Sequence, residues 1–419
     1  MDGLPPKESP VLHHDPVLPA VPLLDMQRQY EPLRDAIRAA IDRVCESGRF
    51  ILGPDCEQLE KGVAAFTGAK HAVACASGSD ALLLALMAVG VQPGDEVIVP
   101  SFTFFATASA VSRLGGVPVF VDIEPRTFNM NPELIAERTT AATKAIVPVH
   151  LFGQCADMDA IRTVAAAHQL PLIEDAAQSI GAGVGDKSAG ALGDIGCFSF
   201  YPTKNLGGFG DGGLLTTEDD DLAAQLKLLR AHGMEPRYHH KVVGINSRLD
   251  SIQAAILNVK LPHLNRWAQL RRANAEFYTE LMTECGLDRI LTLPAVAPNR
   301  RHVWNQYVVR VPNGRRDALR THLSAAKVGT EVYYPLGLHE QECFKPLGYR
   351  PGSLPETEQA AREVLALPIF PELRVVEQRA VVTRIAEFFG AARPSSPTSV
   401  KRPKFLDRPT GSRAKREVG

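Results

Sequence analysis

The 419-residue chain lacks several features that would narrow its function at once. It has no apolar run long enough to span a membrane, and its seven cysteines form no CxxC pair. Its 46 basic and 47 acidic side chains nearly cancel, so no bulk charge favours nucleic acid or a membrane surface. No cluster of histidine and cysteine has the spacing of a metal site. We therefore expect a reduced, cytoplasmic protein with no metal, disulfide framework, nucleic-acid partner or membrane partner.

The two ends of the chain differ in composition from the rest. Residues 1–21 form a proline-rich arm without a continuous apolar run, so they do not have the pattern of a signal peptide. Residues 391–419 are rich in proline, serine and basic side chains, which is typical of a disordered tail. The segment between them is long enough for one large domain and one smaller domain.

Strand-like apolar runs alternate with helix-like segments from about residue 30 to residue 260. The apolar runs are continuous, which indicates strands buried on both faces of a largely parallel sheet. We therefore predict a large α/β domain over residues 22–260. The predicted strands are 73–76, 96–99, 117–123, 145–152, 170–173, 196–200 and 213–216, with helices at 80–89 and 158–168.

Helices and strands are mixed in the remainder, residues 261–390, which predicts a smaller α+β domain. A long helix at 251–270 is expected to kink near Pro262, because proline removes a backbone hydrogen bond. Further helices are predicted at 271–285, 316–326, 356–367 and 376–389, and strands at 303–311 and 332–334.

An apolar and aromatic segment, residues 199–202, leads to Lys204 and then to a glycine-rich turn at 207–213. A lysine is costly to bury and normally points into water. At the end of a buried strand its pKa would fall, and its amine could act as a nucleophile, as a Schiff-base lysine does. For a lysine taken alone, a place in a surface loop is the more common outcome.

Another apolar strand, at 170–173, ends in two acids, Glu174 and Asp175. Ligands bind beyond the carboxyl ends of the strands in parallel sheets. Because adjacent residues on a strand point to opposite faces, only one of these carboxylates can face a given ligand, and the pattern does not choose between them. A helix N-cap after the strand explains the same acids equally well.

Two turns contain the small residues that phosphate-binding loops use. Residues 77–79, Ser-Gly-Ser, lie between a predicted strand and a predicted helix, where free N–H groups could hold a phosphate. Ordinary helix capping accounts for them as well. Residues 208–213 match GxGxxG as a string, but a strand follows them where a dinucleotide site needs a helix. We therefore reject a nicotinamide site.

Together, these features resemble the DegT/DnrJ/EryC1/StrS family of sugar aminotransferases, which use pyridoxal phosphate on the aspartate aminotransferase (type I) fold. The resemblance covers residues 22–389. It implies a mostly parallel seven-stranded sheet in the large domain. The segments that carry it are 77–82, 101–104, 148–153, 174–178, 199–205, 246–250 and 333–339.

The resemblance implies a role for each matched residue. Lys204 is then the Schiff-base lysine, and Asp175 is the acid that faces the pyridine nitrogen and keeps it protonated. Tyr334 and His339 are expected to border the sugar pocket. The other cofactor contacts that it implies are Phe104 on the ring, Gln178 near the phenolic oxygen, Gly78, Ser79 and Ser199 at the phosphate, and Asn246 reaching the phosphate from a second subunit.

The same resemblance implies that a homodimer with shared active sites moves an amino group from L-glutamate to a nucleotide-linked keto sugar. Such a reaction makes amino sugars for polysaccharide, O-antigen or glycosylated natural products. Segments 333–335 and 365–368 favour C-3 of a UDP- or dTDP-linked sugar, with C-4 as an alternative. Related dehydratases carry histidine in place of Lys204, so this lysine argues for transamination. A non-catalytic, regulatory member that binds cofactor or sugar is the other alternative, which the intact Lys204 and Asp175 disfavour.

Overall fold

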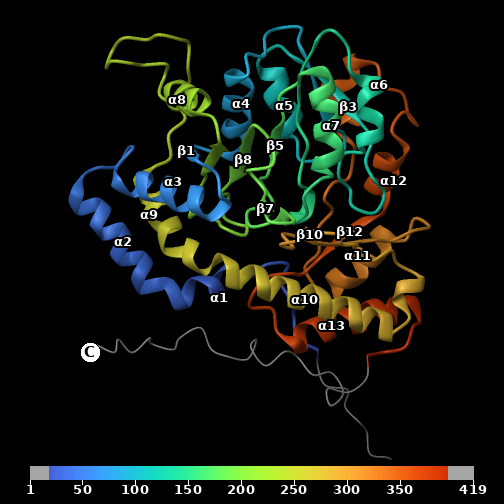
Figure 1. The fold of residues 1–419 in the computed structure, drawn as a ribbon. Helices are drawn as coiled ribbons and strands as arrows, with labels where there is room; N and C mark the ends of the chain where they lie inside the picture. The colour runs from blue at the N-terminus through green and yellow to red at the C-terminus, as the bar shows by residue number, and fades with distance from the viewer. Residues whose placement is uncertain (1–17, 395–419) are drawn as a thin grey trace, which may run out of the picture.

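The computed structural model describes residues 18–394 of the chain. Two ladders of strands lie at its centre (Figure 1). Isolated parallel bridges, Ile146 with Leu172 and Val149 with Asp175, join the ladders into one seven-stranded sheet. β9 runs antiparallel to both neighbours and the other pairings are parallel, which confirms the predicted, mostly parallel sheet. The ladders run β1 (His71–Cys75), β9 (Gly213–Thr217), β8 (Ile195–Ser199), β5 (Ile173–Asp175), and β3 (Val117–Val121), β2 (Glu96–Pro100), β4 (Thr143–Ile146).

Helices cover both faces of this sheet, and neighbouring strand residues belong to different cores. On β1, Val73 packs into the core beneath α4 and α5, whereas Ala74 packs into the core beneath α3 and α9. Leu215 and Leu214 of β9 divide in the same way. Burial on both faces explains why the strands read as continuous apolar runs. The helices of this region are α2 (Arg34–Ser47), α3 (Pro54–Thr67), α4 (Gly78–Ala88), α5 (Ala106–Arg113), α7 (Met158–His168), α8 (Asp220–Leu229) and α9 (Ser251–Lys260).

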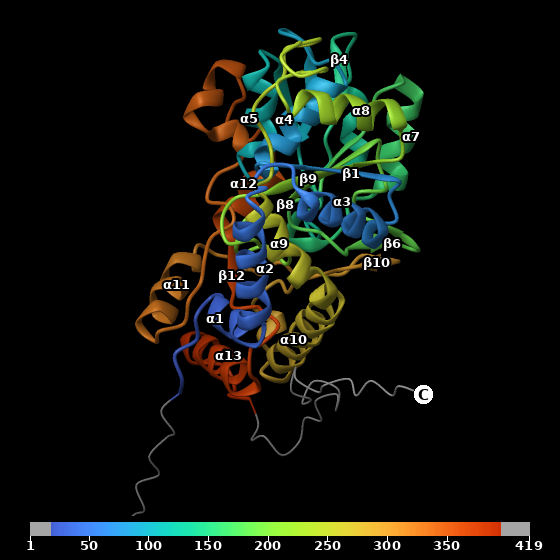
Figure 2. The same cartoon turned by 90° about the vertical axis from the view of Figure 1, so that its left-hand side faces the viewer.

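The C-terminal part of the chain packs around a separate core below the sheet (Figures 1 and 2). Its antiparallel pair consists of β11 (Tyr307–Arg310) and β12 (Val364–Leu367). Its helices are α10 (Leu264–Glu284), α11 (Arg316–Ala325), α12 (Pro355–Glu363) and α13 (Val375–Phe389). α10 contributes Leu264 to the sheet core and Tyr278 to the second core, so it spans both parts. The domain limits at 21, 260 and 390 stay predictions.

Four secondary-structure predictions need correction. The predicted helix 356–367 ends at Glu363, because the buried residues 364–367 pair with β11 instead. Residues 332–334 form no strand, and only Glu331 makes a bridge there, to Ala366. β4 ends at Ile146, although its apolar run continues to residue 152. The chain does kink at Pro262, in a 3₁₀ turn, but α10 then continues without a break at 270.

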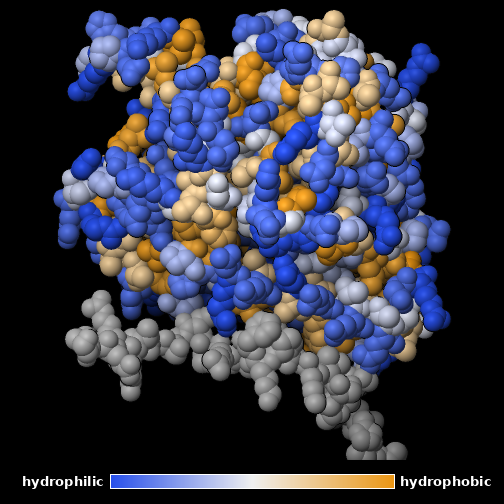
Figure 3. Space-filling model, in the orientation of Figure 1, coloured by the Kyte–Doolittle hydropathy of each residue, from blue (hydrophilic) through white to orange (hydrophobic). Residues whose placement is uncertain are grey.

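Several short elements complete the fold. Figure 3 shows hydrophilic side chains interrupted by scattered apolar patches on the face that it draws. Within residues 18–394, no helix is long and apolar enough to cross a membrane, and no cluster of acidic, histidine and cysteine side chains could hold a metal. The tail prediction falls mainly on residues 395–419, and most of the arm on residues 1–17, which lie outside the described residues. The short elements are α1 (Met26–Tyr30), α6 (Ile135–Arg138), β6 (Gly183–Val184), β7 (Lys187–Ser188) and β10 (Arg300–Arg301).

Candidate active site

The two acids at the end of β5 have separate surroundings. Glu174 is fully buried and accepts hydrogen bonds from its own fold. His150 Nε2 donates to its Oε2 at 2.8 Å. The backbone N–H groups of Gly190, Leu192 and Gly193 donate to its two carboxylate oxygens at 2.6–2.8 Å. Glu174 therefore holds the 190–193 loop in place and has no capacity left for a ligand.

Asp175 points to the other face. Its Oδ2 accepts a hydrogen bond from Thr107 Oγ1 at 2.7 Å, and its Oδ1 accepts one from the N–H of Ala177 at 3.2 Å. Burial raises the pKa of this carboxyl, and the bonds from Thr107 and Ala177 and the charge of Lys204 work against that rise. Thr107, which fixes the Asp175 carboxylate, was not singled out from the sequence, because a threonine within an ordinary helix carries no local signal.

Lys204 lies in a turn directly after β8, which is the strand next to β5. Its own N–H donates to the carbonyl of Tyr201 at 2.9 Å, and its side chain is largely out of water. Loss of hydration lowers the pKa of the amine to about 8, although the charge of Asp175 acts in the opposite direction. The structure thus places the predicted lysine and the predicted aspartate close enough to affect each other's protonation.

The start of α4 and the end of β8 approach each other closely. Ser77 caps α4 by accepting a hydrogen bond from the N–H of Asp80, at 3.1 Å. A Cβ atom on Gly78 would lie 2.6 Å from the Cβ of Ser199, so only glycine fits at this position. The N–H groups of the first helical turn have no partners within their helix, and the helix dipole favours an anion there. Gly78, Ser79 and Ser199 are therefore neighbours, as a phosphate site requires.

The rejected GxGxxG string has a structural role at the same place. Residues 213–217 are strand β9, not a helix. A Cβ atom on Gly213 would collide with the carbonyl of Ser77. This glycine therefore lets β9 pass directly behind the start of α4.

Aromatic and amide side chains also lie near Asp175. Gln178 Oε1 accepts a hydrogen bond from the N–H of Phe152 at 2.6 Å, and its Nε2 donates to the Tyr334 hydroxyl at 3.3 Å. Burial and the nearby charge of Asp175 raise the pKa of Tyr334. The ring of Phe104 is 57% exposed and lies 6.2 Å from the ring of Tyr334. An exposed phenylalanine ring beside a partly buried tyrosine leaves a flat apolar surface open to a ligand.

Two further predicted site residues differ in exposure: His339 is buried and Asn246 is exposed. The His339 side chain is buried, with Nδ1 2.7 Å from Ser101 Oγ and Nε2 3.4 Å from Glu358 Oε1. Both ring nitrogens therefore have protein partners, and the place of His339 at the border of the sugar pocket stays a prediction. Asn246 is exposed, and the next residue, Ser247, accepts a hydrogen bond from the N–H of Ala76.

These residues fit pyridoxal phosphate. The cofactor needs an amine that loses its proton readily, a carboxylate for its ring nitrogen and a tight backbone cradle for its phosphate. Lys204, Asp175 and the contact between Gly78 and Ser199 provide these three features. The chemistry of this donor set therefore matches the cofactor that the resemblance implies.

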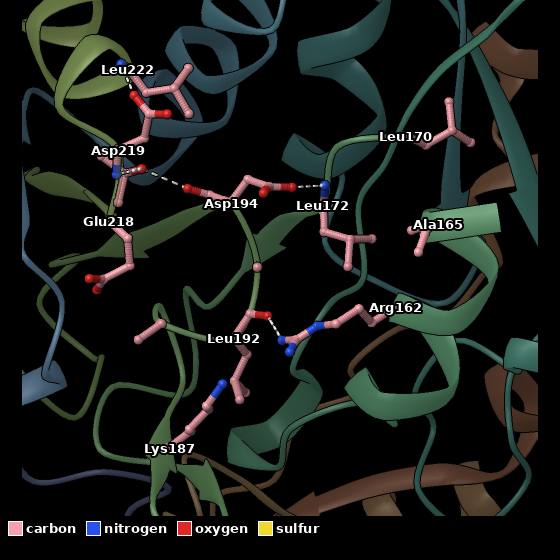
Figure 4. Close-up of a pocket in the computed structure, with 14 residues that line it drawn as sticks. Arg162, Ala165, Leu170, Leu172, Lys187, Leu192, Asp194, Glu218, Asp219 and Leu222 are labelled. Carbon is pink, nitrogen blue, oxygen red and sulfur yellow. Dashed lines mark hydrogen bonds between the residues drawn. The ribbon is translucent and has the colours of Figure 1, made fainter. Parts of the chain in front are cut away.

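A separate groove of about 470 Å³ lies between α7, α8 and the chain before β8 (Figure 4). None of the predicted site residues lines it. Arg162 donates to the carbonyl of Leu192, Asp194 accepts from the N–H of Leu172, and Asp219 caps α8. These three charged side chains are thus used by the fold itself.

Residues 32–386 match the sequence profile described as the DegT/DnrJ/EryC1/StrS aminotransferase family. A "pleiotropic regulatory protein" of Geobacillus stearothermophilus is 52% identical over 88% of this chain and 98% of its own length. A UDP-N-acetyl-3-dehydro-alpha-D-glucosamine 3-aminotransferase of Acidithiobacillus ferrooxidans is 45% identical over 87% and 97%.

A solved structure agrees with these matches. DesV of S. venezuelae, in complex with a ketimine intermediate, has a TM-score of 0.85 and 43% identity and covers 88% of this chain and 98% of its own. This likeness confirms the predicted type I fold and the predicted cofactor, pyridoxal phosphate.

Proposed function

Because the chain belongs to the DegT/DnrJ/EryC1/StrS aminotransferase family, we propose that it moves an amino group from L-glutamate to C-3 of a UDP- or dTDP-linked 3-keto sugar. The enzyme class, a sugar aminotransferase, is that of the family and of the named relatives. The observation that carries the proposal is Lys204, an amine whose pKa is lowered to about 8 within reach of the Asp175 charge.

The proposed roles follow from the environment of each side chain. When bound, pyridoxal phosphate supplies an electron sink for the bond that breaks at the amino carbon. Lys204 would anchor the cofactor and then, once free, carry a proton as a general base, for which a pKa near the working pH is best. Asp175, held by Thr107, would keep a proton on the ring nitrogen. Gln178 and Tyr334 would border the ring and the sugar.

The choice of C-3 rests on the relatives. The Acidithiobacillus relative is named for transfer at C-3 of a UDP sugar, and we extend that reaction to this chain. The name of the Geobacillus relative favours the second candidate, a regulatory protein that binds cofactor without turnover. Lys204 and Asp175 together support catalysis, because attaching the cofactor needs the lysine amine but does not need a carboxylate that keeps the ring nitrogen protonated.

We include a homodimer with shared active sites in the proposal. A loop between α8 and α9 projects from the body (Figure 1), and it exposes 75% of Tyr238 and 90% of Val243. Asn246 lies just after these residues and is itself exposed. Such apolar exposure is typical of a surface that another chain covers. The seven free cysteines support the cytoplasmic location that forms part of the same proposal.

The experiment is reconstitution of the purified chain with pyridoxal phosphate. We expect a visible absorption band from the bound cofactor. Borohydride reduction should remove the band and attach the cofactor permanently to Lys204, as peptide mass spectrometry would show. L-glutamate should then release 2-oxoglutarate, and nucleotide keto sugars should accept the amine at a carbon located by NMR. Lys204→Ala should neither form the absorption band nor release 2-oxoglutarate. A circular dichroism spectrum equal to that of the wild type would show that this variant is folded. A wild-type protein that binds the cofactor but releases no 2-oxoglutarate would favour the regulatory candidate.

A further inference from the structure

A second lysine, Lys260, is buried beneath the turn that carries Lys204. It is the last residue of α9 and is 2% exposed. Its Nζ donates to the carbonyl of Gly207 at 2.5 Å, three residues after Lys204. Burying an amine costs free energy, so a lysine in this place needs a strong acceptor to be tolerated. The family features described above give Lys260 no role.

α9 holds the turn at two points. Gln253 Oε1 accepts a hydrogen bond from the N–H of Phe209 at 2.8 Å, two residues after the carbonyl that Lys260 holds. Gln253 and Lys260 are seven positions apart, which is nearly two helical turns, so they lie on one face of α9. The Phe209 ring also lies 5.7 Å from the Lys260 amine, within the range of a cation–π contact.

A backbone hydrogen bond closes the turn that carries Lys204. The N–H of Gly208 donates to the carbonyl of Phe200 at 2.8 Å, which spans the loop that contains Lys204. Gly207 has no room for a side chain, because a Cβ atom would collide with Pro202. Lys260 adds a charged contact from outside the turn, at the Gly207 carbonyl.

The charge of Glu372, in the C-terminal part of the chain, acts on this amine. Glu372 lies between β12 and α13, and its buried Oε2 has no hydrogen-bond partner among the described residues. Burial lowers the pKa of Lys260 to about 8, and the charge of Glu372 acts to raise it.

We propose that Lys260 is a positioning residue for Lys204, which acts by holding the Gly207 carbonyl and so fixing the turn that presents the Lys204 amine. The inference rests on the proposed role of Lys204. A reactive group misplaced by about 1 Å can lose on the order of a hundredfold in rate, so a tether three residues away is worth testing. Lys260 touches no substrate or cofactor in this proposal.

The test uses the full-length protein free of cofactor. Competitive labelling with acetic anhydride across a pH series, read by peptide mass spectrometry, gives the apparent pKa of Lys204 without any turnover. In Lys260→Met the turn loosens and Lys204 gains water, so its pKa should rise by about one unit toward that of a free lysine. With cofactor added, kcat of the glutamate half-reaction should fall about tenfold while KM stays within about twofold.

Three further variants make the result decisive. Lys227→Met removes an exposed lysine of α8 and should change neither the pKa of Lys204 nor kcat. Lys260→Arg keeps the charge and a donor, and a cavity of about 330 Å³ beside Lys260 gives the guanidinium room, so it should restore the wild-type pKa of Lys204 in part. Gln253→Met removes the neighbouring tie and should raise that pKa by a smaller amount.

The proposal would be overturned if folded Lys260→Met had the same Lys204 pKa and the same kcat as the wild type. If Lys260→Met does not fold, the other two variants decide. An unchanged Lys204 pKa in Gln253→Met would overturn the proposal. A Lys204 pKa that rises in Gln253→Met but not in Lys260→Arg would support it. Failure of the wild type to attach pyridoxal phosphate would instead count against the proposed function, since the labelling does not need the cofactor.

Discussion

The carboxyl end of the central sheet and the groove in Figure 4 both collect charged side chains, but they use them differently. In the groove, Arg162, Asp194 and Asp219 each bond to the backbone of a neighbouring loop or helix. At the carboxyl end, hydrogen bonds of the backbone hold Lys204 and Phe104 in place. The Lys204 amine and the exposed Phe104 ring are left free for a ligand. Charge alone therefore does not mark a site. A site is marked by a titratable side chain whose burial costs free energy and which makes no bond that the fold needs.

The sharpest form of this comparison lies within one strand, between Asp175 and Glu174. Asp175→Asn should lower kcat by about a thousandfold or more, because the ring nitrogen loses its charged partner, while unfolding changes little. Glu174→Gln should lower the free energy of unfolding by about 2–4 kcal/mol, because an amide replaces an oxygen that accepts backbone N–H groups. Steady-state kinetics and urea denaturation of both variants measure the two effects. Equal kinetic loss in two well-folded variants would break the comparison.

The close approach of α4 to β8 predicts the next effect. Gly78→Ala places a methyl group against Ser199, so the cradle must open. We expect the Kd of pyridoxal phosphate to rise at least about tenfold, which corresponds to about 1.4 kcal/mol. Fluorescence titration of the cofactor-free protein measures it. Gly185→Ala is a useful control, because Gly185 has a left-handed backbone but open space around it, so strain would appear without loss of affinity.

The pKa of Lys204 gives a pH dependence. Its value of about 8 lies below that of an unfolded lysine, so the folded chain disfavours the charged amine. Below pH 8 this lowers stability, and the loss disappears as the pH rises from about 8 to 10.5. The rate at which pyridoxal phosphate attaches should rise with pH and level off above about 8. A rate that keeps rising to pH 10.5 would show an ordinary, hydrated amine.

The groove should give the smallest effect. Arg162→Ala removes one bond to the Leu192 carbonyl, from a side chain that is largely exposed. Stability should fall by at most about 1 kcal/mol, and kcat should not change. Thermal denaturation and the glutamate half-reaction check both values. A clear loss of activity would mean that the groove contributes to function after all.

Much of the fold is readable from local patterns. Continuous apolar runs predict buried strands, and Pro262 predicts the kink between α9 and α10. The strand at 364–367 was missed, because its pairing with β11 lies more than fifty residues away and leaves no periodic trace. The partners of His339, Ser101 and Glu358, could not be read from the sequence, because both lie far from it along the chain.

The sequence by itself determined the segments that meet at the site: a lysine after one strand, two acids after another and a serine-glycine turn before a helix. Only the tertiary structure decided which acid faces the lysine, because the choice depends on what lies on each face of β5. Glu174 is taken up by the 190–193 loop, and Asp175 remains on the side of Lys204. Lys260 shows the same limit. Its sequence neighbours describe a helix end, and only the packing of α9 beneath the Lys204 turn gives its amine a partner.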